Sequence, residues 1–192
     1  MKILIFIISA LAFGADIKVT DLKVGDILLQ PLHCYSCNLI EAQTRSEYSH
    51  IGVIVSSSKG QILVAEAFKK VRVVSLKEFN KKTQKGLKLE VLRPHYVSDN
   101  LYRDYRENFD GLPYDSMFLW GDESIYCSEL VQKLFAKSGM LTPNPKPMSF
   151  DTNPEYWDRY FRGETPRGKL GISPEDFKLS KLFVELGFYE AK

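Results

Sequence analysis

Two neighbouring segments of strand-type composition, 48–56 and 61–68, constrain the fold more than any other feature of this chain. Both are rich in β-branched and other apolar residues, and a turn at 58–60 separates them, so they are predicted to form a β hairpin. His50 stands beside the apolar run of the first strand, and Glu66 interrupts the apolar run of the second. The hairpin is therefore predicted to carry a polar pair inside an apolar sheet.

The two polar residues are predicted to lie side by side. Residue numbers 50 and 66 sum to 116, and a turn centred on residue 58 pairs positions with that sum directly across the hairpin. A histidine in a strand is usually a core residue with satisfied hydrogen bonds. Burying a carboxylate without a partner is costly, however, so Glu66 needs a neighbour, and His50 is the side chain available to it.

The other predicted strands are joined by short turns, which favours an antiparallel sheet over a parallel one. A single α+β domain is therefore predicted for residues 16–192. Its further strands are predicted at 27–30, 71–74 and 87–93, its helices at 37–44, 75–80, 98–111, 124–139 and from 173 onward, and the proline-rich stretch 142–154 as an extended crossover.

Cys127 is predicted to lie at the start of a helix capped by Ser124, at the third helical position. The unpaired amides and the positive end of a helix favour a thiolate over a thiol, and the same amides can stabilise an oxyanion. A cysteine in this place is often only a small buried hydrophobe. Together with His50 and Glu66, however, it predicts the Cys-His-Glu triad of a thiol hydrolase.

Five sequence blocks occur in a characteristic order along the chain. They are GDILLQ at 25–30, YSHIGV at 48–53, AEA at 65–67, GLPYD at 111–115 and YCSELV at 126–131. Together they resemble the YiiX/YebB-like branch of the NlpC/P60 superfamily, the permuted papain-fold cysteine amidases. The C-terminal stretch around residues 156–157 and 171–177 resembles the extension found in that family.

This resemblance implies a circularly permuted papain-like, NlpC/P60-type fold, in which an antiparallel sheet packs against helices. It implies catalytic roles for Cys127, His50 and Glu66, in the order histidine, acid, cysteine along the chain. It also suggests that Tyr114, Asp115 and Tyr126 line a substrate-binding cleft, with packing as the alternative role for Tyr114 and Asp115.

The first 15 residues are predicted to be a secretory signal peptide. Lys2 precedes an apolar run over 3–13, which is too short to span a bilayer, and small residues follow. Cleavage is predicted after residue 12, 14 or 15, giving a periplasmic or secreted protein without a stable membrane anchor. A buried first strand or an uncleaved anchor is the alternative.

Cys34 and Cys37 form a Cys-x-x-Cys pair, and cysteines of exported proteins tend to be paired. This spacing is predicted to give either a local disulfide or two buried thiols. A zinc site would need four ligands, and only His33 lies nearby, so neither a metal nor a cofactor is predicted.

The formal charge of +2 is too balanced for a nucleic-acid-binding protein. Positive charge is nevertheless concentrated in 69–88, which could steer an anionic substrate or form a solvated face. It holds eight basic residues against one acid: Lys69, Lys70, Arg72, Lys77, Lys81, Lys82, Lys85 and Lys88.

The predicted function is hydrolysis of amide bonds in a peptide or in peptidoglycan. Acyl chemistry on a lipid-derived substrate is an alternative within the same superfamily. A binding module that has kept the fold without catalysis is the alternative from another class.

Overall fold

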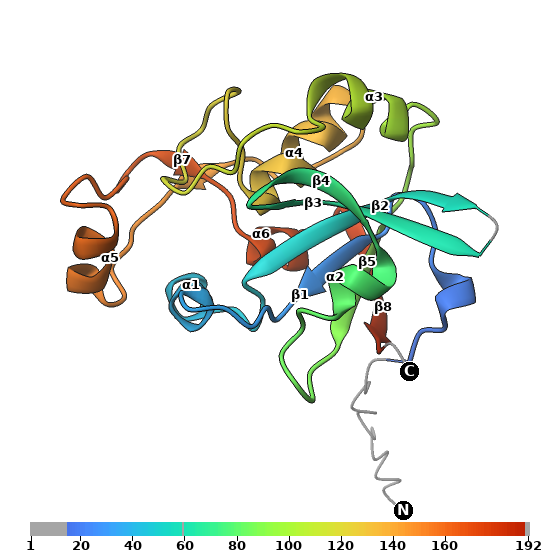
Figure 1. The fold of residues 1–192 in the computed structure, drawn as a ribbon, viewed down its shortest axis with the longest axis horizontal. Helices are drawn as coiled ribbons and strands as arrows, with labels where there is room; N and C mark the ends of the chain where they lie inside the picture. Colours follow the sequence, from blue (N-terminus) through green and yellow to red (C-terminus); the bar gives the residue numbers. More distant parts are fainter. Residues whose placement is uncertain (1–14, 59, 191–192) are drawn as a thin grey trace, which may run out of the picture.

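A six-stranded antiparallel sheet forms the centre of the computed structural model, which describes residues 15–58 and 60–190 (Figure 1). The strands follow the order β4-β3-β2-β1-β5-β8, so each of the first four pairs with its neighbour in sequence. They are β1 (Ile27–Gln30), β2 (His50–Ser58), β3 (Gln61–Phe68), β4 (Lys70–Ser75), β5 (Leu89–Pro94) and β8 (Phe183–Tyr189). The predicted signal peptide lies outside the described residues except for Ala15.

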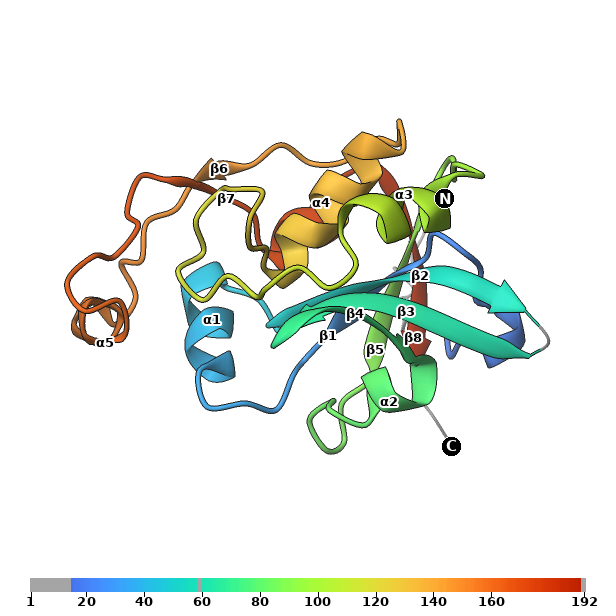
Figure 2. The same ribbon diagram turned by 45° about the horizontal axis from the view of Figure 1, so that its top comes forward.

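Helices cover both faces of this sheet, and Figure 2 shows α3 and α4 on one face and α2 on the other. A two-stranded sheet formed by β6 (Lys146–Pro147) and β7 (Leu170–Gly171) lies further out, and loops connect it to α5 at the edge of the molecule. The helices are α1 (Cys37–Thr44), α2 (Leu76–Asn80), α3 (Leu101–Asn108), α4 (Cys127–Lys137), α5 (Pro154–Tyr160) and α6 (Pro174–Lys178), with a 3₁₀ turn at Val19–Asp21.

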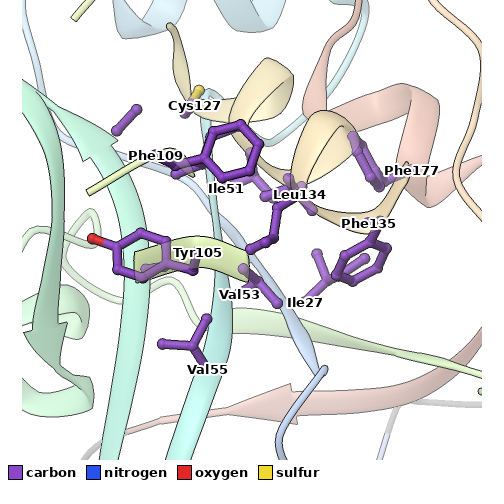
Figure 3. Close-up of a cluster of buried hydrophobic side chains, with 14 of the residues drawn as sticks. Ile27, Ile51, Val53, Val55, Tyr105, Phe109, Cys127, Leu134, Phe135 and Phe177 are labelled. Atoms are coloured by element: carbon purple, nitrogen blue, oxygen red, sulfur yellow. The ribbon is translucent and has the colours of Figure 1, made fainter. Parts of the chain in front are cut away.

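The alternation of side chains along β2 fills two separate cores. Ile51, Val53 and Val55 point toward α3 and α4, in the cluster that Figure 3 shows. Ile54 points the other way, into a second cluster that includes Phe79 of α2. Because every strand residue of β2 from His50 to Val55 is buried, the polar residues on it must find partners inside the protein.

The predicted α+β class and antiparallel sheet are confirmed. The bounds of β1, β3 and α1 match their predicted ranges, and Ser75 caps α2 by accepting a hydrogen bond from the Glu78 N–H at 3.1 Å. Two helix starts were wrong: α3 begins after Asn100 rather than Ser98, and α4 begins after Tyr126 rather than Ser124.

The predicted register of the hairpin was also wrong. The pairs Val53↔Ala65 and Ile54↔Val64 have residue numbers that sum to 118, and a bulge between Ile54 and Ser56 changes the sum to 119 toward the turn. The turn therefore lies further along the chain than predicted. His50 and Glu66 are diagonal neighbours on one face of the sheet instead of being directly opposite.

Candidate active site

Cys127 is the first residue of α4, the helix that packs against β2 and β3. It is a free thiol and is 6% exposed, at the edge of the larger core cluster (Figure 3). The first helical turn leaves the N–H groups of Cys127 and Ser128 without partners inside the helix. The sulfur therefore lies beside unpaired amides and the positive end of the helix, as the sequence predicted.

His50 is the first residue of β2, so its ring lies at the end of the strand. Its Nε2 is 2.9 Å from Oε2 of Glu66, and its ring stacks on Phe79 with centroids 5.6 Å apart. This contact with Glu66 leaves Nδ1 as the ring nitrogen available to Cys127. The diagonal register thus still gives the histidine-carboxylate contact that the sequence predicted.

Cys127 and His50 interact, and each shifts the pKa of the other. Burial alone would lower the pKa of His50, but its interactions with Cys127 and then Glu66 outweigh burial and raise that pKa. Burial alone would raise the pKa of the Cys127 thiol, but the interaction with His50 lowers it. Both shifts favour a thiolate-imidazolium pair, the reactive form of a catalytic cysteine.

Glu66 is fully buried and has three cationic partners. Besides His50, its carboxylate accepts hydrogen bonds from Arg72 of β4, with Nη2 at 2.8 Å, and from Lys82, whose Nζ is 2.7 Å from both oxygens. Burial would raise the pKa of Glu66, but the contacts with His50 and Lys82 outweigh it and lower that pKa to about 2. The carboxylate is therefore ionised at neutral pH.

Sequence reasoning missed Arg72 and Lys82 as partners of Glu66. Both belong to the basic segment 69–88, which was predicted to steer substrates or to form a solvated face. Arg72 pairs with Glu66 across the β3–β4 ladder, a register that the hydrophobic pattern does not reveal. The excess of basic residues in this segment was the available signal. It could have been combined with the isolated carboxylate of Glu66, which needs cationic partners when it is buried.

Gly52 allows the aromatic ring beneath His50 to approach the sheet. A Cβ at this position would lie 2.7 Å from both Phe79 and Val64, closer than van der Waals contact allows. Any side chain here would push Phe79 away from the strand and from the imidazole that stacks on it. The glycine two residues after His50 therefore helps to set the orientation of the histidine ring.

A cleft of about 280 Å³ opens at the sulfur of Cys127. Residues of α1, the loop before α4, the β6–β7 region and α6 surround it. Tyr114 and Tyr126 are among its lining residues, as predicted. Much of the rest of the lining is apolar and includes Ile40, Phe118, Met148, Phe150, Trp157 and Ile172.

Asp115 does not line this cleft. It is buried, and its two carboxylate oxygens accept hydrogen bonds from the N–H groups of Met117 at 2.8 Å and Leu119 at 2.5 Å. The predicted substrate-binding role of Asp115 is therefore corrected to a structural one. Its side chain fixes the loop that carries Phe118 to the cleft.

The residues on either side of Cys127 attach the C-terminal segment to the start of α4. The hydroxyl of Tyr126 accepts a hydrogen bond from the Ile172 N–H at 2.9 Å, and the hydroxyl of Ser128 donates to the Ile172 carbonyl at 3.0 Å. Glu129 accepts a hydrogen bond from the Tyr126 N–H at 3.4 Å, and burial raises its pKa to about 7. One cleft wall is thus anchored directly beside the thiol.

Cys34 and Cys37 form a disulfide at the start of α1, a helix that also contributes residues to the lining of the cleft. Their Cα atoms are 5.1 Å apart, a spacing typical of disulfides. Within residues 15–58 and 60–190, no group of three or more His, Cys, Asp or Glu side chains is arranged to hold a metal ion. None of the helices in the same ranges has the length and hydropathy of a membrane span.

Comparison with known proteins gives consistent matches. The sequence model of the permuted papain-like amidase family C92 matches residues 21–178. The description of this family names YaeF and YiiX. YiiX of Escherichia coli strain K12 is 32% identical over 120 residues, which cover 59% of this chain and 57% of that protein. The aligned region thus spans less than two thirds of that relative.

The fold is also found in a solved structure. The crystal structure of the metalloprotein YiiX from Escherichia coli O157:H7, assigned there to DUF1105, superimposes with a TM-score of 0.77. The sequences are 25% identical, and the match covers 86% of this chain and 97% of that one.

Proposed function

This chain belongs to the permuted papain-like amidase family C92 of YaeF and YiiX, and we propose that it is a thiol hydrolase that cleaves amide bonds. The predicted resemblance to YiiX and the predicted permuted papain-like fold are thereby confirmed. The observation that carries the proposal is the meeting of a buried thiol, an imidazole and an ionised carboxylate, with the thiol lining a cleft.

The proposed reaction uses these groups in two half-reactions. The Cys127 thiolate attacks the carbonyl carbon, and the N–H groups at the start of α4 stabilise the oxyanion. The His50 imidazolium gives its proton to the leaving amine, which departs and leaves a thioester. Water then attacks the thioester while His50 accepts its proton. The acid product is released, and the thiolate-imidazolium pair is restored. Glu66 holds the ring in orientation throughout.

Peptides and peptidoglycan fragments are the substrates we propose first, because family members are described as amidases. The second candidate is a lipid-derived acyl substrate, and one observation favours it: the cleft beside Cys127 has an extensive apolar lining. Either substrate can form the same thioester with Cys127. The leaving group, amine or alcohol, distinguishes the two.

A substrate panel with active-site labelling tests this proposal. We expect hydrolysis of peptide amides or of peptidoglycan fragments, and alkylation by iodoacetamide of Cys127 before Cys34 or Cys37, because Cys127 is the free thiol and its pKa is lowered. Release of fatty acid from acyl esters instead would favour the lipid alternative. Equal labelling of the three cysteines with no turnover would favour a binding module.

We also propose that the protein is exported and that its N-terminal segment is removed. The backbone around the junction supports cleavage before Ala15, because the Ala15 carbonyl accepts a hydrogen bond from the Phe188 N–H at 2.9 Å. Intact mass after alkylation is expected to show a chain that starts between residues 13 and 15, one disulfide and one alkylated thiol. A full-length chain with three free thiols in the cytosol would contradict both export and the disulfide.

The solved relative is described as a metalloprotein. The donor side chains of this chain do not fit a metal site, because no suitable group of three exists among the residues described. The proposed reaction therefore includes no step through a metal ion.

A further inference from the structure

We propose that Lys82 is a positioning residue of the triad, which orients the Glu66 carboxylate toward His50 and favours the thiolate form of Cys127. This inference rests on the proposed function, because it assigns Lys82 to the same site. Lys82 lies 16 residues beyond Glu66, in the turn that follows α2, and no sequence block of the family resemblance includes it.

Lys82 contacts the groups that hold the imidazole. Its Nζ is 2.7 Å from each oxygen of Glu66, so it fixes the plane of the carboxylate that faces Nε2 of His50. The same ammonium lies 4.2 Å from the ring centroid of Phe68 and 5.7 Å from that of Phe79. These two rings flank His50, with centroid distances of 6.0 and 5.6 Å.

The backbone around Lys82 is held in place by the end of β1 and the residues that follow it. The Lys82 carbonyl accepts a hydrogen bond from the His33 N–H at 3.0 Å. The buried Gln30 amide donates to the Phe79 carbonyl and to the Thr83 hydroxyl, both at 2.8 Å. A lysine side chain is flexible, so these restraints on both sides of Lys82 matter for keeping its ammonium on the carboxylate.

The charges behind His50 do not cancel. Glu66 carries one negative charge, and Arg72 and Lys82 carry one positive charge each, while Glu78 contacts Arg72 only at 3.5 Å from an exposed position. The other titratable groups beside Cys127, apart from His50, are Tyr114 and the preceding residue Tyr126. Burial raises the pKa values of both, so both phenols are neutral. The site therefore has a surplus of positive charge, which favours the thiolate.

Removal of the positive charge of Lys82 should shift the titration of Cys127 and His50 in a predictable direction. Positive charge nearby makes it easier to remove a proton from both Cys127 and His50. Replacing Lys82 by a neutral residue should therefore move both macroscopic midpoints of the coupled pair to higher pH. Removal of a single nearby charge shifts the midpoint for thiolate formation by about one pH unit. At a pH below the midpoint, this shift corresponds to about tenfold slower alkylation of Cys127.

The test is the pH dependence of iodoacetamide alkylation of Cys127, which needs no substrate. Lys82→Met is expected to raise the midpoint for thiolate formation by about one pH unit, and Lys82→Arg, which keeps the charge, to restore it. Lys81→Met is the matched control, because Lys81 is adjacent and exposed, and it is expected to leave the midpoint unchanged. Circular dichroism verifies the fold of each variant, and Lys82→Gln replaces Lys82→Met if the latter does not fold.

An unchanged midpoint in a folded, neutral Lys82 variant would overturn the inference, as would an equal shift in Lys81→Met. The outcome is separable from that of the proposed function. A midpoint that depends on Lys82, without turnover of any substrate, would refute the hydrolase and leave the positioning role. Hydrolysis together with an unchanged midpoint would refute the positioning role alone.

Discussion

Replacing Cys127 by alanine is expected to lower kcat/KM by about 10⁴-fold or more, because no other group can form the thioester. Cys127 is 6% exposed and begins α4, where alanine is well tolerated, so the free energy of unfolding should change by only about 1 kcal/mol. Steady-state kinetics on whichever substrate the panel identifies, with thermal denaturation of the same samples, measure both effects.

The imidazole supplies an independent readout for the same variant. Because interaction with Cys127 raises the pKa of His50, the loss of the thiol should lower the pKa that NMR titration of His50 reports. Cys127→Ser, which replaces the thiol by a hydroxyl, is the matched control for side-chain volume and should be nearly as inactive. Full activity in either variant would show that Cys127 is not the nucleophile.

Glu66→Gln is expected to lower turnover by about 10²- to 10⁴-fold while some activity persists, because a glutamine can still contact His50 but can hold it in the wrong tautomer. The variant should also lose stability, by about 3 kcal/mol at neutral pH, since Arg72 and Lys82 would lose the anion between them. Turnover assays and denaturant titration at pH 7 measure the two losses.

The contribution of Glu66 to the free energy of unfolding should decrease as the pH is lowered. The pKa of Glu66 is about 2 in the folded protein and near 4.5 in an unfolded chain, so the native state binds fewer protons. Its contribution to stability is fully present above about pH 5 and is lost as the pH falls toward 2, by about 3 kcal/mol in total. The stability difference between the wild type and Glu66→Gln should therefore shrink on acidification.

Glu78→Gln is the control for both experiments, because Glu78 also contacts Arg72 but is 54% exposed and does not contact His50. Its effect on stability should stay below about 1 kcal/mol, and its turnover should match the wild type. Wild-type turnover in Glu66→Gln would remove Glu66 from the triad. A stability difference that grows on acidification would contradict the ionised state assigned to it.

The sequence was sufficient to predict the hairpin, the side chains of His50 and Glu66 on one face, and a cysteine at the start of a helix. These features depend on local signals: alternation, turn residues and one charged residue inside an apolar strand. An error of two positions in the register did not move either side chain to the other face, because side chains alternate with a period of two. The predicted contact between His50 and Glu66 is therefore present although the predicted register was wrong.

Features that depend on contacts distant in sequence were not predicted. β8 is an edge strand that contains Gly187, so its alternation of apolar and polar residues is weak. α5 begins at Pro154, the last residue of the stretch 142–154 that was predicted to be extended. Asp115 is a local exception, because its carboxylate accepts hydrogen bonds from amides two and four residues further along its own loop. Lys82 reaches Glu66 only because β1 positions the turn after α2, and no local pattern encodes that arrangement.

The spacing of the three cysteines has a consequence for folding kinetics. Cys34 and Cys37 are separated by 3 residues, whereas Cys127 follows Cys37 by 90 residues. Loop-closure entropy favours the short ring over a ring to Cys127 by about 3 kcal/mol, so the local pair should close first during oxidative folding. Once the sheet forms, burial of Cys127 limits the access of other thiols to it. We therefore expect the disulfide at the start of α1 to form without a competing bond to Cys127, which leaves the proposed nucleophile reduced.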